Sequence, residues 1–162
     1  ISAIEPAALP EFYGQEVTPM NVASILKVKG KSVATAPPED TIETVAQKLA
    51  SRKIGAIVIV GESGHVAGII SERDIIRVVA EKGAAALLRP VSEVMTKNVM
   101  TCNVSSTIDQ MMSIMTQGRF RHVPVIEDGA LVGIISIGDV VKHHIAEVQM
   151  EVTAMRDYLA TG

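Results

Sequence analysis

The chain has 162 residues, 48% hydrophobic and 20% charged, which suits one compact domain or two small fused domains. With two Phe, two Tyr and no Trp, its core must be built from aliphatic side chains and Met. The net charge of −3, without clusters of Lys or Arg, argues against a nucleic-acid partner, and no apolar run reaches the roughly 20 residues that cross a membrane.

The first half of the chain predicts one α/β unit over residues 21–83, after an N-terminal extension over residues 1–20. The predicted elements are a short helix near Val22–Leu26, a brief strand ending at Thr35, an amphipathic helix with Ile42, Val45 and Leu49 on one face, hairpin strands Ala56–Val60 and His65–Ile70, and a helix after Ser71. The extension contains no apolar segment typical of a signal peptide.

A linker over residues 84–89 leads to a second unit over residues 90–147. The linker begins within a tract of small residues, Gly83-Ala84-Ala85-Ala86, that carries no motif. Its predicted elements are a short helix at Val91–Met95, a brief strand ending at Thr101, a helix with Ile108, Met111, Met112 and Met115 on one face, strands His122–Ile126 and Leu131–Ile135, and a helix after Ser136. The lone Cys102 excludes an internal disulfide and favours a reducing, cytoplasmic setting.

The two units repeat one another. The heptapeptide GIISERD at Gly68–Asp74 recurs in the second unit as GIISIGD at Gly133–Asp139. Upstream of the heptapeptide, Thr41-Ile42 recurs as Thr107-Ile108 with nearly the same offset along the chain. Because such landmarks keep their order, with small insertions between them, the pattern indicates a duplication.

Each heptapeptide ends in Ser-x-x-Asp at the start of a predicted helix. A capping box explains this spacing, since Ser accepts a hydrogen bond from the backbone three residues on and the acid returns one. A nucleotide site needs the same geometry, because free N–H groups at a helix N-terminus attract phosphate and a carboxylate can accept bonds from a ribose diol. The residues alone leave both interpretations open.

The last helix carries a seam of apolar residues at alternating steps of four and three. The seam residues are Val141, Ile145, Val148, Val152, Met155 and Leu159. Such a seam must be buried against a partner, either the opening segment with Phe12 and Tyr13 or a second chain. The neighbouring His143, His144 and Glu147 are interpreted as exposed rather than as metal ligands, because adjacent His side chains point to different helix faces.

The duplicated strand–strand–helix unit with Gly-x-x-Ser-x-x-Asp resembles the CBS (cystathionine β-synthase) domain, over roughly residues 22–147. The segment from Arg119 to Val125 also resembles the family's second strand. The resemblance implies an α+β fold of two β-α-β-β-α repeats related by a pseudo-twofold axis, here with a long C-terminal helix. It also implies an adenosyl ligand: AMP first, alternatively ADP, ATP, NAD(H) or S-adenosylmethionine.

The resemblance implies two clefts between the repeats, each taking its ribose-binding Asp from one repeat and its base contacts from the other. Carried over, the first cleft would contain Ser71, Arg73, Asp74, Met95, Lys97, Val99, Arg121 and His122. The second would contain Leu26, Lys31, Val33, Ala56, Ile57, Ser136, Gly138 and Asp139. Because Arg73 in the first cleft is replaced by Gly138 in the second, we expect the first to hold the more anionic part of a ligand. Alternatively, the Arg side chains are solvated or pair with nearby acids.

The expected function is a stand-alone regulatory sensor of an adenine nucleotide: not an enzyme, without a metal, cytoplasmic and homodimeric. It would bind neither nucleic acid nor membrane, and it could signal to another protein. One alternative is a structural dimerisation module with unoccupied clefts. Another is the regulatory part of a larger enzyme or transporter.

Overall fold

The computed structural model describes residues 19–162, so the opening segment with Phe12 and Tyr13 lies outside the described residues. The elements in order are α1 (Val22–Lys29), β1 (Thr35–Ala36), α2 (Ile42–Arg52), β2 (Ala56–Val60), β3 (Val66–Ser71), α3 (Glu72–Lys82), the 3-10 segments η2 (Ala84–Leu88) and η3 (Val91–Glu93), α4 (Ile108–Gly118), β4 (His122–Glu127), β5 (Ala130–Ser136) and α5 (Ile137–Thr161). This mixed α+β order confirms the predicted fold class.

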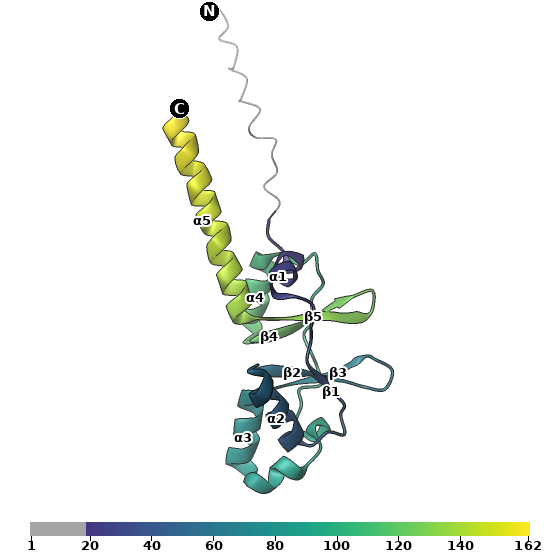
Figure 1. Cartoon of the computed structure of the whole chain (residues 1–162). Helices are drawn as coiled ribbons and strands as arrows, with labels where there is room; N and C mark the ends of the chain where they lie inside the picture. The colour runs from purple at the N-terminus through teal and green to yellow at the C-terminus, as the bar shows by residue number, and fades with distance from the viewer. Residues whose placement is uncertain (1–18) are drawn as a thin grey trace, which may run out of the picture.

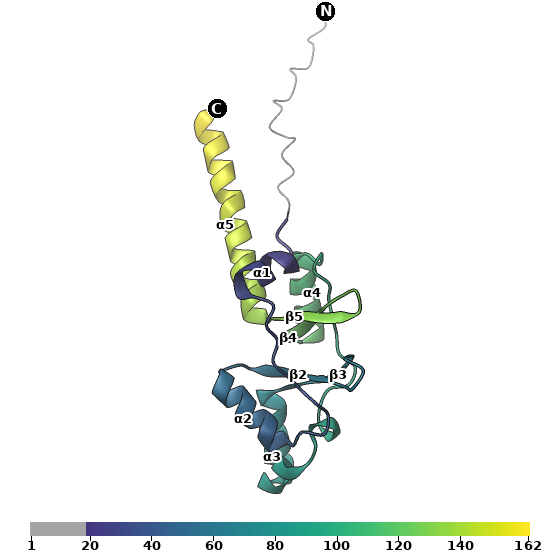
Figure 2. The same cartoon turned by 45° about the vertical axis from the view of Figure 1, so that its right-hand side comes forward.

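Two small sheets lie in the middle of the molecule, and the helices cover their outer sides (Figures 1 and 2). The first sheet has the order β1-β2-β3, with β1 parallel and β3 antiparallel to β2. The second is the antiparallel pair β4-β5. The predicted brief strands differ from those observed: β1 begins at Thr35 instead of ending there. Its counterpart in the second repeat is a single parallel bridge between Cys102 and Val125.

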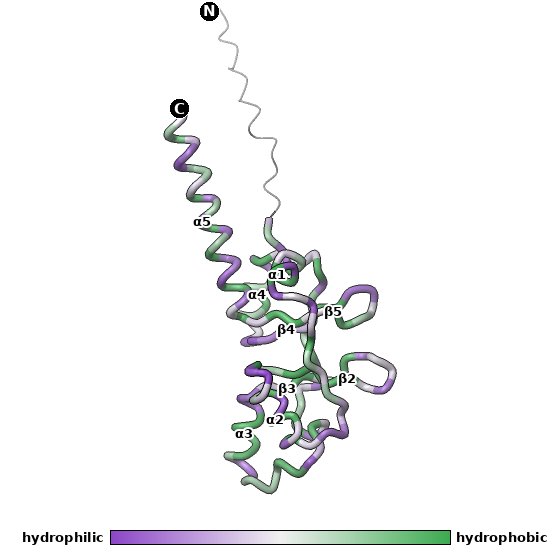
Figure 3. Tube along the Cα trace, in the orientation of Figure 1, coloured by the Kyte–Doolittle hydropathy of each residue, from purple (hydrophilic) through white to green (hydrophobic). Residues whose placement is uncertain are grey.

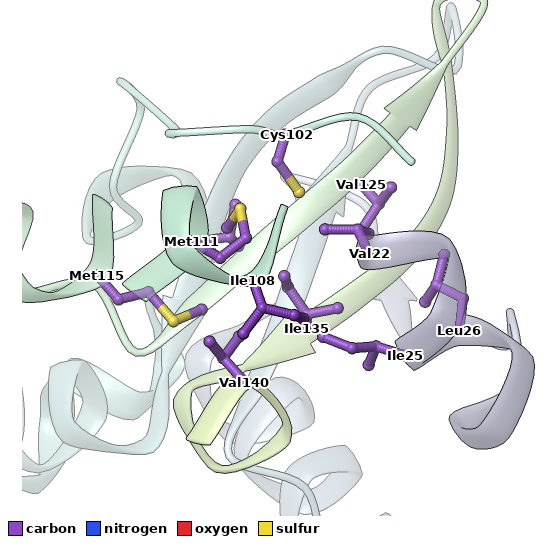
Figure 4. Packing of buried hydrophobic residues seen from close by; sticks show 11 residues of the cluster. Val22, Ile25, Leu26, Cys102, Ile108, Met111, Met115, Val125, Ile135 and Val140 are labelled. Carbon is purple, nitrogen blue, oxygen red and sulfur yellow. The ribbon is translucent and has the colours of Figure 1, made fainter. Parts of the chain in front are cut away.

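Each sheet packs on its own aliphatic core. The first core contains Ile42, Val45 and Leu49 from α2 together with buried residues of β2 and β3. In the second, Ile108, Met111 and Met115 of α4 pack against β4 and β5 (Figure 4). The predicted helix faces are therefore confirmed, except that Met112 is only partly buried at the edge of its core.

The two repeats exchange their first helical segments. Helix α1 packs into the second core through Val22, Ile25 and Leu26 (Figure 4), whereas Val91 of η3 packs into the first core. Backbone hydrogen bonds show the same exchange in both directions. The Val22 amide donates to the Ser106 carbonyl at 2.9 Å, and the Val91 amide donates to the Asp40 carbonyl at 2.7 Å. The contacts of one repeat are thus matched by equivalent contacts of the other, as a pseudo-twofold pair requires.

Two helical segments differ from the sequence prediction, and a third, the long C-terminal helix, confirms it. The linker is the 3-10 segment η2, in which Ala86 is buried against the first core. The segment at Val91–Met95 forms only the 3-10 turn Val91–Glu93. Helix α5 has 25 residues and extends away from α4 and β5, with hydrophobic and hydrophilic stretches alternating along it (Figures 1 and 3). In the part of the chain that the structure describes, no helix is long and apolar enough to span a membrane.

Candidate functional site

Two equivalent helix N-termini carry the Ser-x-x-Asp motifs. In the first, the Asp74 amide donates to Ser71 Oγ at 3.3 Å, and the Ser71 amide donates to Asp74 Oδ2 at 2.9 Å. In the second, the same two bonds join Ser136 and Asp139 at 3.2 and 2.8 Å. Both motifs therefore form capping boxes, and in each box the Asp uses its Oδ2 atom, so Oδ1 takes no part in the cap.

The cleft beside Asp74, called here the Asp74 cleft, has a volume of about 350 Å³. Its walls come from both repeats: Gly55, Ala56, Ile69, Ser71, Glu72, Arg73, Asp74, Arg77 and Thr96 on one side, and Gly118, Arg119, Phe120, Arg121 and His122 on the other. Four of these residues are Arg, so cationic residues line a cleft at a helix N-terminus that already favours anions.

The local chain geometry brings the second repeat into this cleft. Helix α4 ends at Gly118, and the next residue, Arg119, has the left-handed conformation, with φ of 56°, and turns the chain into β4. Phe120 packs directly over Gly118, where an added Cβ would clash with the ring. On the other wall, Ile69 and Thr96 are joined by two backbone hydrogen bonds of 2.9 and 3.0 Å. These contacts fix the cleft without using the remaining oxygen of Asp74, which lies 3.6 Å from Arg77.

The equivalent cleft of the second repeat, called here the Asp139 cleft, has a volume of about 340 Å³. Its lining residues are Lys29, Ser32, Ala34, Arg52, Ile54, Gly55, Ala56, His122, Ile134 and Ser136. Lys29 Nζ donates to Asp139 Oδ2 at 2.7 Å and to the Ile134 carbonyl at 2.9 Å. Burial acts to raise the pKa of Asp139, but the hydrogen bonds from Lys29 and Ser136 outweigh it and hold that pKa below its ordinary value.

The two clefts share part of their walls, namely Gly55, Ala56 and His122. The His122 ring lies against Gly55, 3.2 Å from where a Cβ would stand. Burial, together with the charge of Lys29, lowers the pKa of His122, so its neutral form is favoured near pH 7. His122 lines both clefts, and its counterpart at the start of the first hairpin is the small residue Ala56.

The structure brings five of the eight residues predicted for the first cleft together in its wall. These are Ser71, Arg73, Asp74, Arg121 and His122. Of those predicted for the second cleft, Ala56 and Ser136 line the wall. Asp139 does not line it, but it accepts a hydrogen bond from Lys29, which does. The other predicted residues that line neither cleft are Met95, Lys97, Val99, Leu26, Lys31, Val33, Ile57 and Gly138.

Three of the predicted base contacts have structural roles instead. Leu26 is buried against Gly133, where a Cβ would lie 2.6 Å from its side chain. Met95 packs in the same way over Gly68, its sulfur 2.5 Å from a Cβ there. Ile57 is fully buried in the first core. The glycine of each heptapeptide is therefore required because a side chain of the exchanged segment lies directly over it.

Sequence reasoning did not assign Lys29, Arg52, Arg77 or Phe120 to the clefts. Phe120 could have been found, because it holds the place in the second repeat that Ile54 holds in the first, two residues before the hairpin. Lys29 has no such signal, since its position depends on where helix α1 ends.

The other candidate residues show no sign of a reactive or metal site. Burial raises the pKa of Cys102 to about 11, which keeps its thiol protonated and inert near neutral pH. His143 Nδ1 lies 2.9 Å from the Asp139 carbonyl, whereas His144 Nδ1 lies 3.7 Å from Asp109 on α4. The two His side chains thus point to different neighbours, and within residues 19–162 no group of three or more His, Cys, Asp or Glu could hold a metal ion.

Comparison with protein families gives a match to the CBS domain twice, over residues 25–81 and 91–145. A mitochondrial CBS domain-containing protein of Arabidopsis thaliana, CBSX3, is 31% identical over 98% of this chain and 79% of its own length. The chain spans only 22–23% of the length of some other CBS-domain proteins of that plant.

Solved structures share the fold. The CBS-domain containing protein ATU1752 from Agrobacterium tumefaciens is 52% identical, with a TM-score of 0.75 over 77% of this chain and 99% of that one. The CBS domain pair of MJ0100, in complex with 5′-methylthioadenosine and S-adenosyl-L-methionine, is 28% identical with a TM-score of 0.71 over 80% and 98%. PAE2072 from Pyrobaculum aerophilum, complexed with AMP, is 27% identical with a TM-score of 0.67 over 74% and 89%.

Proposed function

This chain belongs to the CBS domain family as a tandem pair of repeats, and we propose that it is a regulatory module that binds AMP in the Asp74 cleft. In this proposal the repeats span residues 21–83 and 90–147, joined by a linker at 84–89, and residues 148–162 extend the last helix. Two related pairs of known structure bind adenosine compounds, AMP in one and methylthioadenosine with S-adenosylmethionine in the other, which supports an adenosine-type ligand.

The observation that carries the proposal is the composition of the Asp74 cleft. It combines a carboxylate with an oxygen outside the cap, a helix N-terminus, and four Arg residues in one hollow. A ribose diol would donate to Asp74, and the phosphate would be held by guanidinium groups. Phe120 and Ile69 offer apolar surface to the base, and this explains how a chain with few aromatic residues can hold adenine.

The charge of the cleft ranks the possible ligands. AMP, ADP, ATP and NAD(H) all bring phosphate to the Arg residues, whereas S-adenosylmethionine brings a sulfonium cation that the same residues repel. We therefore place phosphate-bearing ligands first. The Asp139 cleft serves in this proposal as a second site of different affinity.

The proposed assembly is a closed homodimer that buries the seam of α5. Within the described chain this seam is open: Ile145 is 51%, Met155 66% and Leu159 72% exposed. The heptad-like steps of four and three are typical of helix pairing, and a second copy supplies the same seam.

Light scattering should report about twice the 17.2 kDa chain mass. Truncation after Glu147 should reduce it, and an unchanged dimer would show that the seam is not the interface.

Binding without catalysis, a cytoplasmic location and a regulated protein partner stay predictions of this proposal. The alternatives are a structural dimerisation module with unused clefts and the regulatory part of a larger enzyme or transporter.

Isothermal titration calorimetry separates ligand sensing from a structural role. AMP should bind with a saturable heat and raise the melting temperature. GMP should bind more weakly, because its O6 and N1–H reverse the hydrogen-bonding pattern of adenine. The absence of binding by AMP at millimolar concentration would favour the structural module.

A further inference from the structure

The carboxylate of Asp139 has a partner that its counterpart lacks. Lys29, the last residue of α1, places its ammonium 2.7 Å from Asp139 Oδ2. The ion pair that the structure describes for the corresponding Asp74 is with Arg77 of its own helix, at 3.6 Å from Oδ1. Both capping boxes share the same two backbone-to-side-chain hydrogen bonds, whereas the Lys29 ammonium comes from the segment that crosses from the other repeat.

Lys29 replaces a backbone contact that is present in the first repeat. There, the Ile69 carbonyl accepts a hydrogen bond from the Thr96 amide at 2.9 Å. Ile134 is the counterpart of Ile69 in the second heptapeptide, and its carbonyl accepts from Lys29 Nζ at 2.9 Å. One ammonium thus bonds both to the strand and to the acid at the start of the next helix. Thr96 is held by its backbone and has no charge to offer to Asp74.

The length of the exchanged helix explains why a cation reaches this point. Helix α1 runs for 8 residues to Lys29 and ends at Gly30, whose φ of 94° suits glycine. The equivalent segment η3 has only 3 residues. Leu26, buried over Gly133, anchors α1 one turn before Lys29. The extra helical turn of α1 therefore carries the ammonium to the mouth of the Asp139 cleft.

We propose that the ion pair between Lys29 and Asp139, called here the latch, makes the second cleft bind anionic adenosine-type ligands in preference to uncharged ones. This inference rests on the proposed function, since it assumes that ribose binds to the capping Asp. Lys29 bonds to Oδ2, which the cap also uses, so the hydroxyls of a neutral nucleoside would bind at Oδ1 to a carboxylate whose negative charge an ammonium already partly neutralises, and they would bind it more weakly. A phosphate offers the displaced ammonium a new anionic partner, and Arg52 and His122 line the same cleft.

The test compares adenosine with AMP by calorimetry in an Asp74→Ala background, so that the Asp139 cleft is measured alone. Adding Lys29→Met should tighten adenosine binding about 2- to 5-fold, the range expected for loss of a partly exposed ion pair. AMP should gain nothing, so the preference for AMP over adenosine should fall by at least the same factor. Lys27→Met is the matched control, because Lys27 is an exposed residue of the same helix, and it should leave both affinities unchanged.

Unchanged or weaker adenosine binding in the Asp74→Ala, Lys29→Met variant would overturn the proposed role of Lys29. A complete absence of adenosine binding in that variant, while the natural chain binds AMP, would overturn it too. In those cases the proposed function stands, because AMP binding at the Asp74 cleft does not depend on Lys29. If neither AMP nor adenosine binds the natural chain or any variant, the proposed function fails and the latch fails with it.

Discussion

The Asp74 cleft and the Asp139 cleft begin from the same repeated heptapeptide and form the same capping box, but the charge around the carboxylate differs. Arg73, Arg77, Arg119 and Arg121 line the first cleft, and Arg77 lies 3.6 Å from Asp74 Oδ1. In the second, an ammonium from α1 is bound to the carboxylate itself. A duplicated motif therefore gives equal backbone geometry, but the function of each copy depends on the residues that the other repeat contributes.

The largest expected effect separates anchoring from capping. Asp74→Ala should weaken AMP binding about 10- to 150-fold, because a charged hydrogen bond to a buried group is worth about 1.5–3 kcal/mol. Asp139→Ala is the control for the cap, which should be worth about 0.3–1 kcal/mol in either motif. It also removes the Lys29–Asp139 pair, so it should cost at least as much stability as Asp74→Ala. Calorimetry and thermal melting measure both quantities. If Asp74→Ala loses only this cap stability and still binds AMP fully, Asp74 is only a cap.

The glycines under the exchanged segments should show a difference in stability. Gly68→Ala places a Cβ 2.9 Å from the Thr96 carbonyl oxygen as well as close to Met95, so the backbone must move. In Gly133→Ala the crowding comes from the Leu26 side chain, at 2.6 Å. Overpacking of this kind costs about 1–3 kcal/mol, and we expect Gly68→Ala to lie at the upper end. Urea denaturation measures the difference, and equal losses would contradict the role given to Thr96.

Exchanging the residue before each Asp should move anion preference from one cleft toward the other. Arg73→Gly should weaken AMP binding about 2- to 5-fold and leave adenosine binding unchanged, because exposed charge pairs contribute at most about 1 kcal/mol. Gly138→Arg fits without strain, since a Cβ there meets only Ser136 Oγ at 3.7 Å, and it should strengthen AMP binding in the Asp139 cleft. Calorimetry with both ligands checks the pair. An equal loss of AMP and adenosine in Arg73→Gly would indicate a structural role for Arg73.

The smallest effect concerns pH. The folded pKa of Asp139 lies below its unfolded value, so this group contributes stability that is fully present above about pH 4 and is lost as pH falls through the folded pKa. Lys29→Met removes one cause of the lowered pKa. The stability difference between the natural chain and this variant should therefore be greatest near pH 7 and shrink below about pH 4. A difference that stays constant from pH 7 to pH 3 would show that the Lys29–Asp139 pair is idle in solution.

Much of the fold could be predicted because the sequence repeats. The landmarks that recur in order along the two units placed the hairpins and the second helix of each, and the capping boxes followed from Ser-x-x-Asp alone. The exchange of α1 and η3 between the cores could not be read from periodicity, since a buried face does not reveal which core buries it. That exchange explains why Leu26 and Met95 lie over glycines instead of lining the clefts.

The charge of the site was predictable only in part. Arg73 and Arg121 are adjacent to motif residues, so their place in the Asp74 cleft could be expected. Arg77 lies one helical turn beyond the motif, and Lys29 reaches Asp139 from the opposite end of the described chain. Both contacts are set by helix length and end point, which local patterns determine only to within a few residues.

The most direct test of the central claim is a crystal structure of the chain grown with AMP. We predict that the ribose hydroxyls bind the Asp74 carboxylate, that the phosphate lies among the Arg residues of the same cleft, and that this site fills before the Asp139 cleft. AMP bound only in the Asp139 cleft, or bound with its ribose away from both Asp residues, would contradict the account.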